Sequence, residues 1–189
     1  QQLVRYHERG DGLRTVRVPT AEQEDDRRPH RELERLVKER TGHLSRIRAL
    51  LATQGVAVKK IGRAFGLRVD LLRMPAGGTL PARLRDELKR EADRLDLVYQ
   101  QGRKLEKERA VALDGAGSRA TKMAAMLLAL KAIGPNSATI LVQEFFGWRE
   151  FKNGKQVGAC AGLTGTPYDS GNDEREQGIS KAGNRRIRA

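Results

Sequence analysis

Residues 81–113, PARLRDELKREADRLDLVYQQGRKLEKERAVAL, form one long helical pattern that decides the fold. Thr79 can cap the start of this helix, and Pro81 falls in the first turn, where a missing N–H is tolerated. Apolar residues recur at alternating three- and four-residue steps, which is the spacing of a coiled-coil seam. They are Leu84, Leu88, Leu95, Val98, Leu105 and Ala112.

Charged residues of both signs cover the rest of this helix. Residues 81–120 contain ten basic and eight acidic side chains, a pattern typical of a solvated helix face. Glu91, Gly102 and Arg109 fall at seam positions, and we expect them to weaken the seam.

A second long helix is predicted earlier in the chain, starting near Thr20. Thr20 followed by Gln23 fits a capping box. Four of the five residues 22–26 are acidic, and their negative charges suit the positive N-terminal end of a helix dipole. Pro29 either kinks this helix or delays its true start, and Gly55 ends it. Its apolar face comprises Leu33, Leu36, Val37, Leu44, Ile47, Leu50 and Leu51.

Residues 55–80 connect the two helices and carry five basic residues against Asp70 alone, a net charge of +4 over 26 residues. Glycine and proline deny this segment a long helix. It is either a solvated loop or a basic tip whose cations contact backbone phosphates without reading sequence. The tip cations that we single out are Lys59, Lys60 and Arg63. The helices 20–54 and 81–113 should pack antiparallel as a hairpin that serves as an arm or spacer.

The segment Asp114–Ser118 breaks the helical pattern, so we place a boundary between a hairpin domain, 20–117, and a C-terminal domain, 118–189. The C-terminal domain should be small and α-rich. A helix over Met123–Leu130, a tight turn at Ile133-Gly134 and a second helix to Phe146 are similar to a helix-hairpin-helix. Such a corner points backbone N–H groups at a phosphate, although a purely structural corner fits equally well.

Four aromatic residues lie within seven positions, and their spacing favours core packing over base stacking. They are Phe145, Phe146, Trp148 and Phe151. A further helix over residues 155–163 contains Cys160, the sole cysteine, which we expect to be a small core residue.

The C-terminal stretch, residues 162–189, has the sequence GLTGTPYDSGNDEREQGISKAGNRRIRA. Asp169-Ser170-Gly171-Asn172 predicts a tight turn that presents Ser170, and a second turn is predicted at residues 181–184. The second turn begins with Lys181, and three further cations follow it: Arg185, Arg186 and Arg188. Arginine suits contact with a phosphodiester because its guanidinium presents a planar fork of donors. A polar hairpin with a solvated basic tail is the alternative.

Three ordered motifs in this stretch resemble the C-terminal domain of a bacterial insertion-sequence transposase family. They are Ala161-Gly162-Leu163-Thr164, Tyr168-Asp169-Ser170-Gly171 and Ser180-Lys181-Ala182-Gly183. That family joins a RuvC-like DEDD nuclease domain to a serine-bearing domain, and it includes RNA-guided bridge recombinases and relatives of the Piv invertase. The family usually has PGIG where this chain has Lys131-Ala132-Ile133-Gly134, which puts the DNA contact of that corner in doubt.

The resemblance implies a DNA transposase or recombinase with Ser170 as the nucleophile that attacks a phosphodiester. The DEDD carboxylates and their Mg²⁺ ions would come from a domain absent here, and residues 1–19 would be the connecting arm from it. This fragment alone would be inactive, and its serine domain would be truncated at the C-terminus. No metal site is assigned to the chain itself. The partners implied are DNA, in some relatives a guide RNA, and further copies through the coiled coil.

The remaining chemistry favours a phosphodiester over a hydrolase triad. His7, His30 and His43 all lie in the arm or the first helix, so no histidine accompanies Ser170 in its own domain. We expect Lys181, Arg185, Arg186 and Arg188 to hold phosphate oxygens; a surface charge run is the alternative.

Bulk composition agrees with a polyanionic partner. Lys and Arg number 37 against 24 Asp and Glu, a net charge of +13, whereas aromatics make up only 4%. The charge favours nucleic acid, and the scarcity of aromatics argues against a base-stacking platform. No apolar run approaches the roughly 20 residues of a membrane span, so a cytoplasmic location is expected.

Two other functions stay open. One is a non-catalytic nucleic-acid-binding or multimerisation module, in which the Ser170 turn is structural. The other is a site-specific invertase of the Piv kind, which shares the mechanism and differs in its target.

Overall fold

The computed structural model describes residues 18–114, 119–170 and 173–188, with the backbone alone for residue 114 and for the stretches 166–170 and 173–177. Most of the predicted arm, the predicted boundary at 115–118, and Gly171 and Asn172 lie outside the described residues. The chain forms two compact units, Arg28–Pro135 and the combination of the segment up to Arg27 with Asn136–Ala189. The structure is mainly helical, as predicted.

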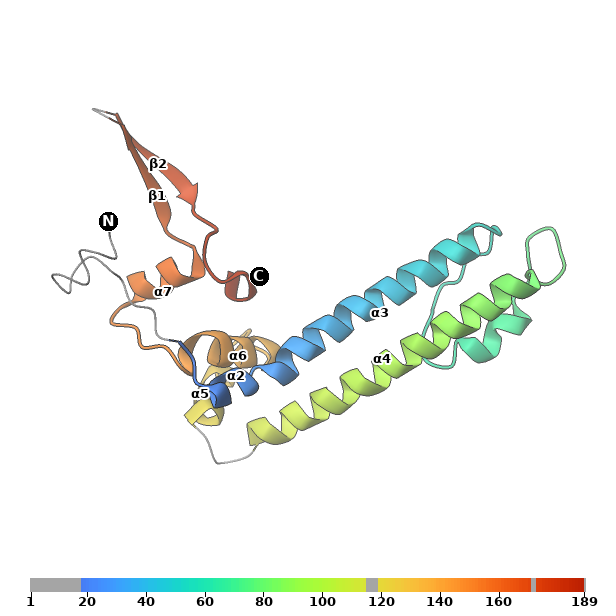
Figure 1. Cartoon of the computed structure of the whole chain (residues 1–189), viewed down its shortest axis with the longest axis horizontal. Helices are drawn as coiled ribbons and strands as arrows, with labels where there is room; N and C mark the ends of the chain where they lie inside the picture. Colours follow the sequence, from blue (N-terminus) through green and yellow to red (C-terminus); the bar gives the residue numbers. More distant parts are fainter. Residues whose placement is uncertain (1–17, 115–118, 171–172, 189) are drawn as a thin grey trace. The chain divides into compact units, whose positions relative to one another are not determined.

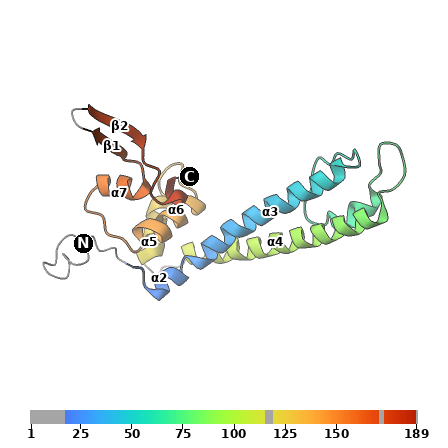
Figure 2. The ribbon, with the colours of Figure 1, turned by 45° about the horizontal axis from the view of Figure 1, so that its top comes forward.

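The first unit is built on the predicted antiparallel helical hairpin. Helix α3, Arg28–Ala52, runs beside α4, Ala82–Asp114 (Figures 1 and 2). Seven of the apolar residues that the sequence assigns to the facing sides of these two helices are buried. They are Leu33, Leu36, Ile47, Leu51, Leu88, Leu95 and Val98. Val37 and Ala112 are exposed instead, since the apolar faces of the two helices do not extend to them.

The predicted first helix is divided in two. Thr20 caps the short helix α2, Ala21–Asp25, with the capping box that the sequence predicts: Gln23 N donates to Thr20 Oγ1 at 3.2 Å and Thr20 N to Gln23 Oε1 at 3.0 Å. Helix α3 then starts at Arg28, with Pro29 in its first turn. Pro29 has no N–H to continue the helix from Asp25, so the delayed start is the alternative that holds.

The connection between α3 and α4 is a folded cap and not a solvated loop. It contains the 3₁₀ helix η1, Gly66–Leu71, and its own apolar side chains complete the core between the two long helices. The buried residues that it contributes are Ile61, Phe65, Val69 and Leu80. The sequence missed this core because the four apolar residues follow no single helix or strand period.

Glu91, which we expected to weaken the seam, is buried, and both of its carboxylate oxygens have partners. Its carboxylate accepts from Arg94 Nη1 at 2.9 Å and Arg46 Nη1 at 3.3 Å, and it also pairs with His43. A buried carboxylate with these partners is a polar cross-link between α3 and α4, which replaces the apolar contact that the pattern lacks there.

After α4, the hairpin unit continues into α5, Arg119–Leu128. The second unit contains α6, Pro135–Leu141, the π-helical turn η2, Val142–Phe146, and α7, Gly154–Ala161. The predicted aromatic core is confirmed here, since the ring centroids of Phe145 and Phe151 lie 4.6 Å apart and those of Phe145 and Phe146 lie 5.1 Å apart.

The chain ends with a hairpin of strands β1, Gly165–Ser170, and β2, Asp173–Ile179, followed by the single-turn helix α8, Arg185–Arg188. The polar hairpin that the sequence analysis gave as the alternative for this stretch is present, although its strand bounds were not predicted. Asp169, placed in a turn by the sequence, belongs to β1. Both strands are polar along both faces, so they lack the apolar alternation by which a strand is recognised. Across the described residues, none of the helices combines the length and apolar character that a membrane crossing requires.

Candidate nucleic-acid interface at the β1–β2 hairpin

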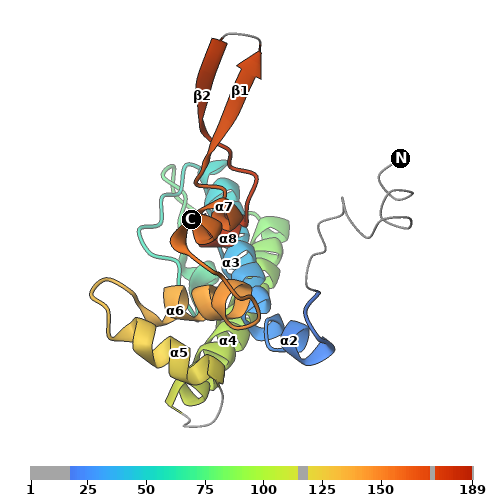
Figure 3. The ribbon, with the colours of Figure 1, turned by 90° about the vertical axis from the view of Figure 1, so that its left-hand side faces the viewer.

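The register of the hairpin places Ser170 at its far end. Ser170 closes β1 and is paired with Asp173, the first residue of β2, while Gly165 is paired with Ile179 at the base. The pairing shifts between Gly165 and Thr166, so Gly178 is an extra residue on β2, a bulge that increases the local twist. The hairpin extends away from α7 and α8 (Figure 3).

Three backbone hydrogen bonds join the segment after β2 to α7, to its C-cap and to the residue that precedes β1. Ser180 N donates to Thr164 O at 3.0 Å, Lys181 N to Gly162 O at 3.1 Å, and Asn184 N to Cys160 O at 3.1 Å. The segment after β2 therefore lies directly against the end of α7.

The glycines at this junction are required by the close approach of the two segments. Gly162 has φ +70°, the left-handed conformation that commonly ends a helix. A Cβ at Gly183 would collide with the backbone of Ala161 and Gly162. The glycine of the Ser180–Gly183 motif is thus explained by packing of one backbone on another.

The four C-terminal cations divide into two pairs. Arg186 Nη1 lies 3.5 Å from Oε1 of Glu144, a residue of η2 that is only 4% exposed. Arg188 Nη1 donates to Ala161 O at 3.4 Å. Arg186 and Arg188 are therefore held against the body of the unit, and the Asn184 side chain caps α8 by accepting from Arg186 N at 3.0 Å.

Lys181 and Arg185 are exposed, and their side chains have no hydrogen bond or ion pair with any residue that the structure describes. Lys181 also has φ +55°, a left-handed backbone that is uncommon for a residue with a side chain. These two cations are the ones free to meet a solution anion.

Ser170 and these cations lie at opposite ends of the hairpin. Strand β1 has six residues, and at about 3.3 Å per residue its two ends are about 17 Å apart. The sequence suggested a hydroxyl directly beside guanidinium groups. The structure instead places the basic segment at the base of the hairpin, one strand length from Ser170.

The other predicted contact residues lie elsewhere. Ile133 is half-buried and Gly134 is exposed, in the turn between α5 and α6, which belong to different units. Pro135 heads α6 and has no N–H, so this helix start offers one phosphate donor fewer than the predicted corner requires. Lys59, Lys60 and Arg63 are exposed on the cap of the hairpin unit.

Several residues at the site were not singled out from the sequence. Besides Glu144, Arg149 contacts Sγ of Cys160, so this cysteine is half-buried and paired and not the small core residue that we expected. The guanidinium carbons of Arg27 and Arg149 lie 4.4 and 4.3 Å from the centroid of the Trp148 ring. Gln143 and Glu144, two polar residues between Val142 and Phe145, were the sequence signal that could have revealed this polar layer.

A metal site was not predicted for the chain, and the ranges that the structure describes contain no group of three His, Cys, Asp or Glu residues placed to hold an ion.

Comparisons with known proteins relate this interface to transposases. Residues 124–189, which include Ser170 and the C-terminal cations, match the family model described as the transposase IS116/IS110/IS902 family. The protein y4rJ of Sinorhizobium fredii, named as a transposase, is 43% identical over 181 residues, which cover 92% of this chain and 46% of that protein. A protein of Pseudomonas aeruginosa named as a family 20 transposase is 29% identical over 177 residues, covering 93% of this chain and 51% of its own length. The chain thus spans about half the length of these curated relatives.

Proposed function

We propose that this chain is part of a DNA transposase that cuts and rejoins DNA, with Ser170 as the nucleophile. The observation that carries the proposal is the family match over residues 124–189, which spans the Ser170 hairpin and the basic segment behind it. Ser170 ends β1 and is paired with Asp173 at the end of the hairpin farthest from α7. This position supports the role, because a nucleophile at the end of a two-stranded projection can reach a DNA strand.

The chemistry proposed for Ser170 is a transesterification. Its Oγ bonds to the phosphorus and loses its proton, while the P–O bond to the departing strand breaks and that oxygen takes a proton. The covalent serine–phosphate bond conserves the energy of the phosphodiester, so the reverse attack by a strand hydroxyl rejoins DNA without another energy source.

We assign activation of the hydroxyl to a DEDD domain outside this chain, whose carboxylates would hold Mg²⁺. The charges around Ser170 favour such a composite site. The paired stretches 169–170 and 173–176 carry four carboxylates against Arg175, a net charge of −3, which opposes the approach of a phosphate. A cationic centre supplied by another domain would offset this repulsion, whereas the hairpin alone would not.

Lys181 and Arg185 would anchor the DNA backbone at the base of the hairpin. The strand length of about 17 Å corresponds to about five base-pair steps of 3.4 Å along a duplex. These cations would therefore contact phosphates other than the one that Ser170 attacks. Arg186 and Arg188 would act indirectly, by holding the basic segment in place.

The test is covalent attachment of DNA by the full-length protein. End-labelled target DNA is incubated with the wild type, with Ser170→Ala and with a control, Ser137→Ala, which removes an exposed hydroxyl of α6. We expect a protease-sensitive DNA adduct from the wild type and the control, and none from Ser170→Ala. An equal adduct from Ser170→Ala would exclude Ser170 as the nucleophile. Recombination by that variant would instead indicate a non-catalytic nucleic-acid-binding or assembly module.

A further inference from the structure

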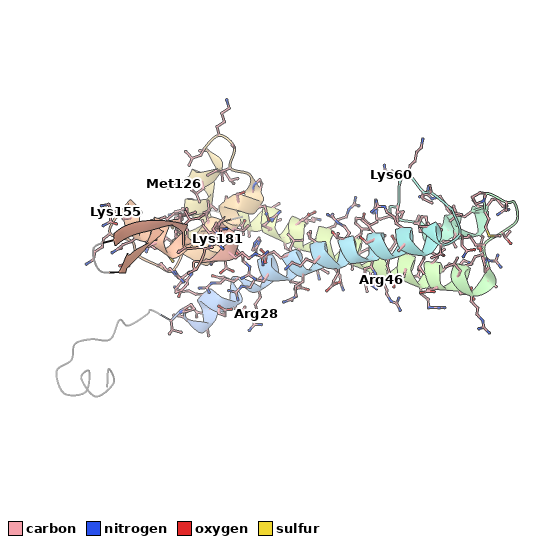
Figure 4. All side chains as sticks on the ribbon, turned by 90° about the horizontal axis from the view of Figure 1, so that it is seen from above. Arg28, Arg46, Lys60, Met126, Lys155 and Lys181 are labelled. Atoms are coloured by element: carbon pink, nitrogen blue, oxygen red, sulfur yellow. The ribbon has the colours of Figure 1, made fainter. Side chains whose placement is uncertain are left out.

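The cap between α3 and α4 presents three cations from a folded base. Lys59, Lys60 and Arg63, here called the tip patch, are exposed, and their side chains have no ion pair or hydrogen bond with the described residues. Beneath them, Phe65 is only 1% exposed and Ile61 is buried. Figure 4 labels Lys60 on this cap. The cations therefore project from ordered backbone.

The backbone that bears the tip patch is fixed by contacts to the rest of the unit. Asp96 of α4 accepts a hydrogen bond from Ala64 N at 3.3 Å, and Ala64 has φ +59°. Arg68 Nη2 donates to Lys60 O at 3.4 Å. A left-handed backbone is strained for alanine and persists only where the surroundings impose it. The position of Arg63, immediately before it, is thus imposed by α4.

The acid of the cap does not neutralise the patch. Asp70, the sole acidic residue in 55–80, lies 2.7 Å from Lys89 Nζ and 3.6 Å from Arg85 Nη1, both on α4. The hydrogen bond from Lys89 is the main reason why the pKa of Asp70 lies below its ordinary value. Desolvation opposes this shift, and the charges of Lys89 and Arg85 add to it. Asp70 is therefore already paired, and the tip patch keeps its charge for an external anion.

We propose that the tip patch is a second nucleic-acid contact, which binds backbone phosphates without reading sequence and acts independently of the Ser170 hairpin. Clustered unpaired lysine and arginine suit a polyanion. The cap offers no exposed aromatic ring for stacking on bases, because Phe65 is its sole aromatic residue and is buried. This contact does not depend on the chemistry proposed for Ser170.

The salt dependence of DNA binding by the 189-residue chain tests this contact. The binding constant for a labelled duplex of arbitrary sequence is measured over a range of salt concentrations. The variant is Lys59→Gln/Lys60→Gln/Arg63→Gln, and the matched control is Arg103→Gln/Lys104→Gln/Lys107→Gln, three exposed cations of α4 with the same total charge change. Each phosphate contact contributes about 0.9 to the slope of log K against log salt, so three contacts contribute about 2.7.

We expect the magnitude of this negative slope to decrease by about 2 to 3 for the tip variant, and by less than about 1 for the control. An unchanged slope for the tip variant, or an equal fall for both variants, would overturn the proposal. Because all six cations are exposed, circular dichroism should show unchanged helix content, and a loss of helix would require the single variants to be measured instead.

Two exposed leucines on the cap allow a competing partner to be tested. Leu67 and Leu71 of η1 are 82% and 70% exposed, and they would suit a second copy of the chain. The variant Leu67→Gln/Leu71→Gln should bind DNA with the wild-type slope. If it loses DNA binding and its sedimentation shows loss of a dimer, the cap is a protein interface and the proposal fails. The salt slope is measured without adduct formation, so its outcome is independent of the Ser170→Ala result.

Discussion

His43 of α3 and Glu91 of α4 are joined across the hairpin, with Nδ1 of the imidazole 2.6 Å from Oε2 of the carboxylate. The second oxygen, Oε1, accepts from Arg46 and Arg94. A slip of α3 along α4 by one turn would separate these groups and bury the carboxylate against apolar side chains. The cluster therefore selects one register of the hairpin, the role for which buried polar groups are best supported.

Glu91→Ala should destabilise the hairpin unit by about 2 to 4 kcal/mol, because it removes the carboxylate and leaves the largely buried His43 without its partner. Urea unfolding followed by circular dichroism measures this loss. Glu106→Ala, at an exposed position of the same helix, is the control and should change the free energy of unfolding by less than about 0.5 kcal/mol. Equal effects of the two substitutions would show that the cluster does not contribute.

The same carboxylate should make the stability of the hairpin unit fall in acid. Burial alone would raise the pKa of Glu91, but the hydrogen bond from His43 and the charges of Arg46, His43 and Arg94 outweigh it, so the pKa lies below its ordinary value. A lowered pKa in the folded state stabilises the fold above the unfolded-state pKa of about 4.3 and loses that contribution as the pH falls through the folded-state pKa.

We therefore expect the free energy of unfolding of the wild type to decrease below about pH 4.3, and Glu91→Gln to show a weaker decrease over the same range. Urea titrations at several pH values measure both. Parallel pH profiles for the two proteins would contradict the assignment.

The helical hairpin could be predicted from the sequence because its apolar residues recur at a regular spacing. Alternating steps in residues 81–113 fix which face of α4 is buried, and Thr20 with Gln23 fixes a helix start through local hydrogen bonds. The cap could not be predicted in the same way. Its buried residues meet α3 and α4 through irregular backbone, and such contacts follow from tertiary packing and not from any local period.

The motifs of the C-terminal stretch could be recognised from the sequence, but the geometry of that stretch could not be predicted. The motifs around Ser170 and Lys181 could be recognised, yet strands with two polar faces carry no burial signal, so the separation of these residues along β1 was not evident. The division of the four C-terminal cations was also hidden, because it depends on Glu144, more than forty residues earlier in the chain than Arg186.

The cap core should depend on Phe65 and not on its exposed neighbour. Phe65→Ala removes a fully buried ring and should destabilise the hairpin unit by about 3 to 5 kcal/mol, whereas Leu67→Ala, at an 82% exposed position two residues later, should be nearly neutral. Chemical unfolding of both variants measures the difference. A small effect of Phe65→Ala would indicate that the cap is not part of the cooperative core.

Glu144 should position the basic segment, and Arg185 should contact the DNA. Glu144→Gln and Arg186→Gln each break the same ion pair, so a double-mutant cycle should give a coupling of about 1 kcal/mol or less, since the Arg186 side chain is 39% exposed. The emission of Trp148, the sole tryptophan, reports unfolding of this unit. Arg185→Gln should leave that transition unchanged and yet weaken binding to a duplex, lowering the salt slope by about 0.9.

The contrast between Arg185 and Arg186 is the decisive comparison, because the two are adjacent in α8 and carry the same charge. If both substitutions reduce the salt slope equally and neither alters the Trp148 transition, then Arg186 contacts DNA directly and its pairing with Glu144 is incidental. If Glu144→Gln weakens DNA binding although it removes a negative charge, then the carboxylate acts by holding the segment, because removal of an acid would otherwise strengthen binding to a polyanion.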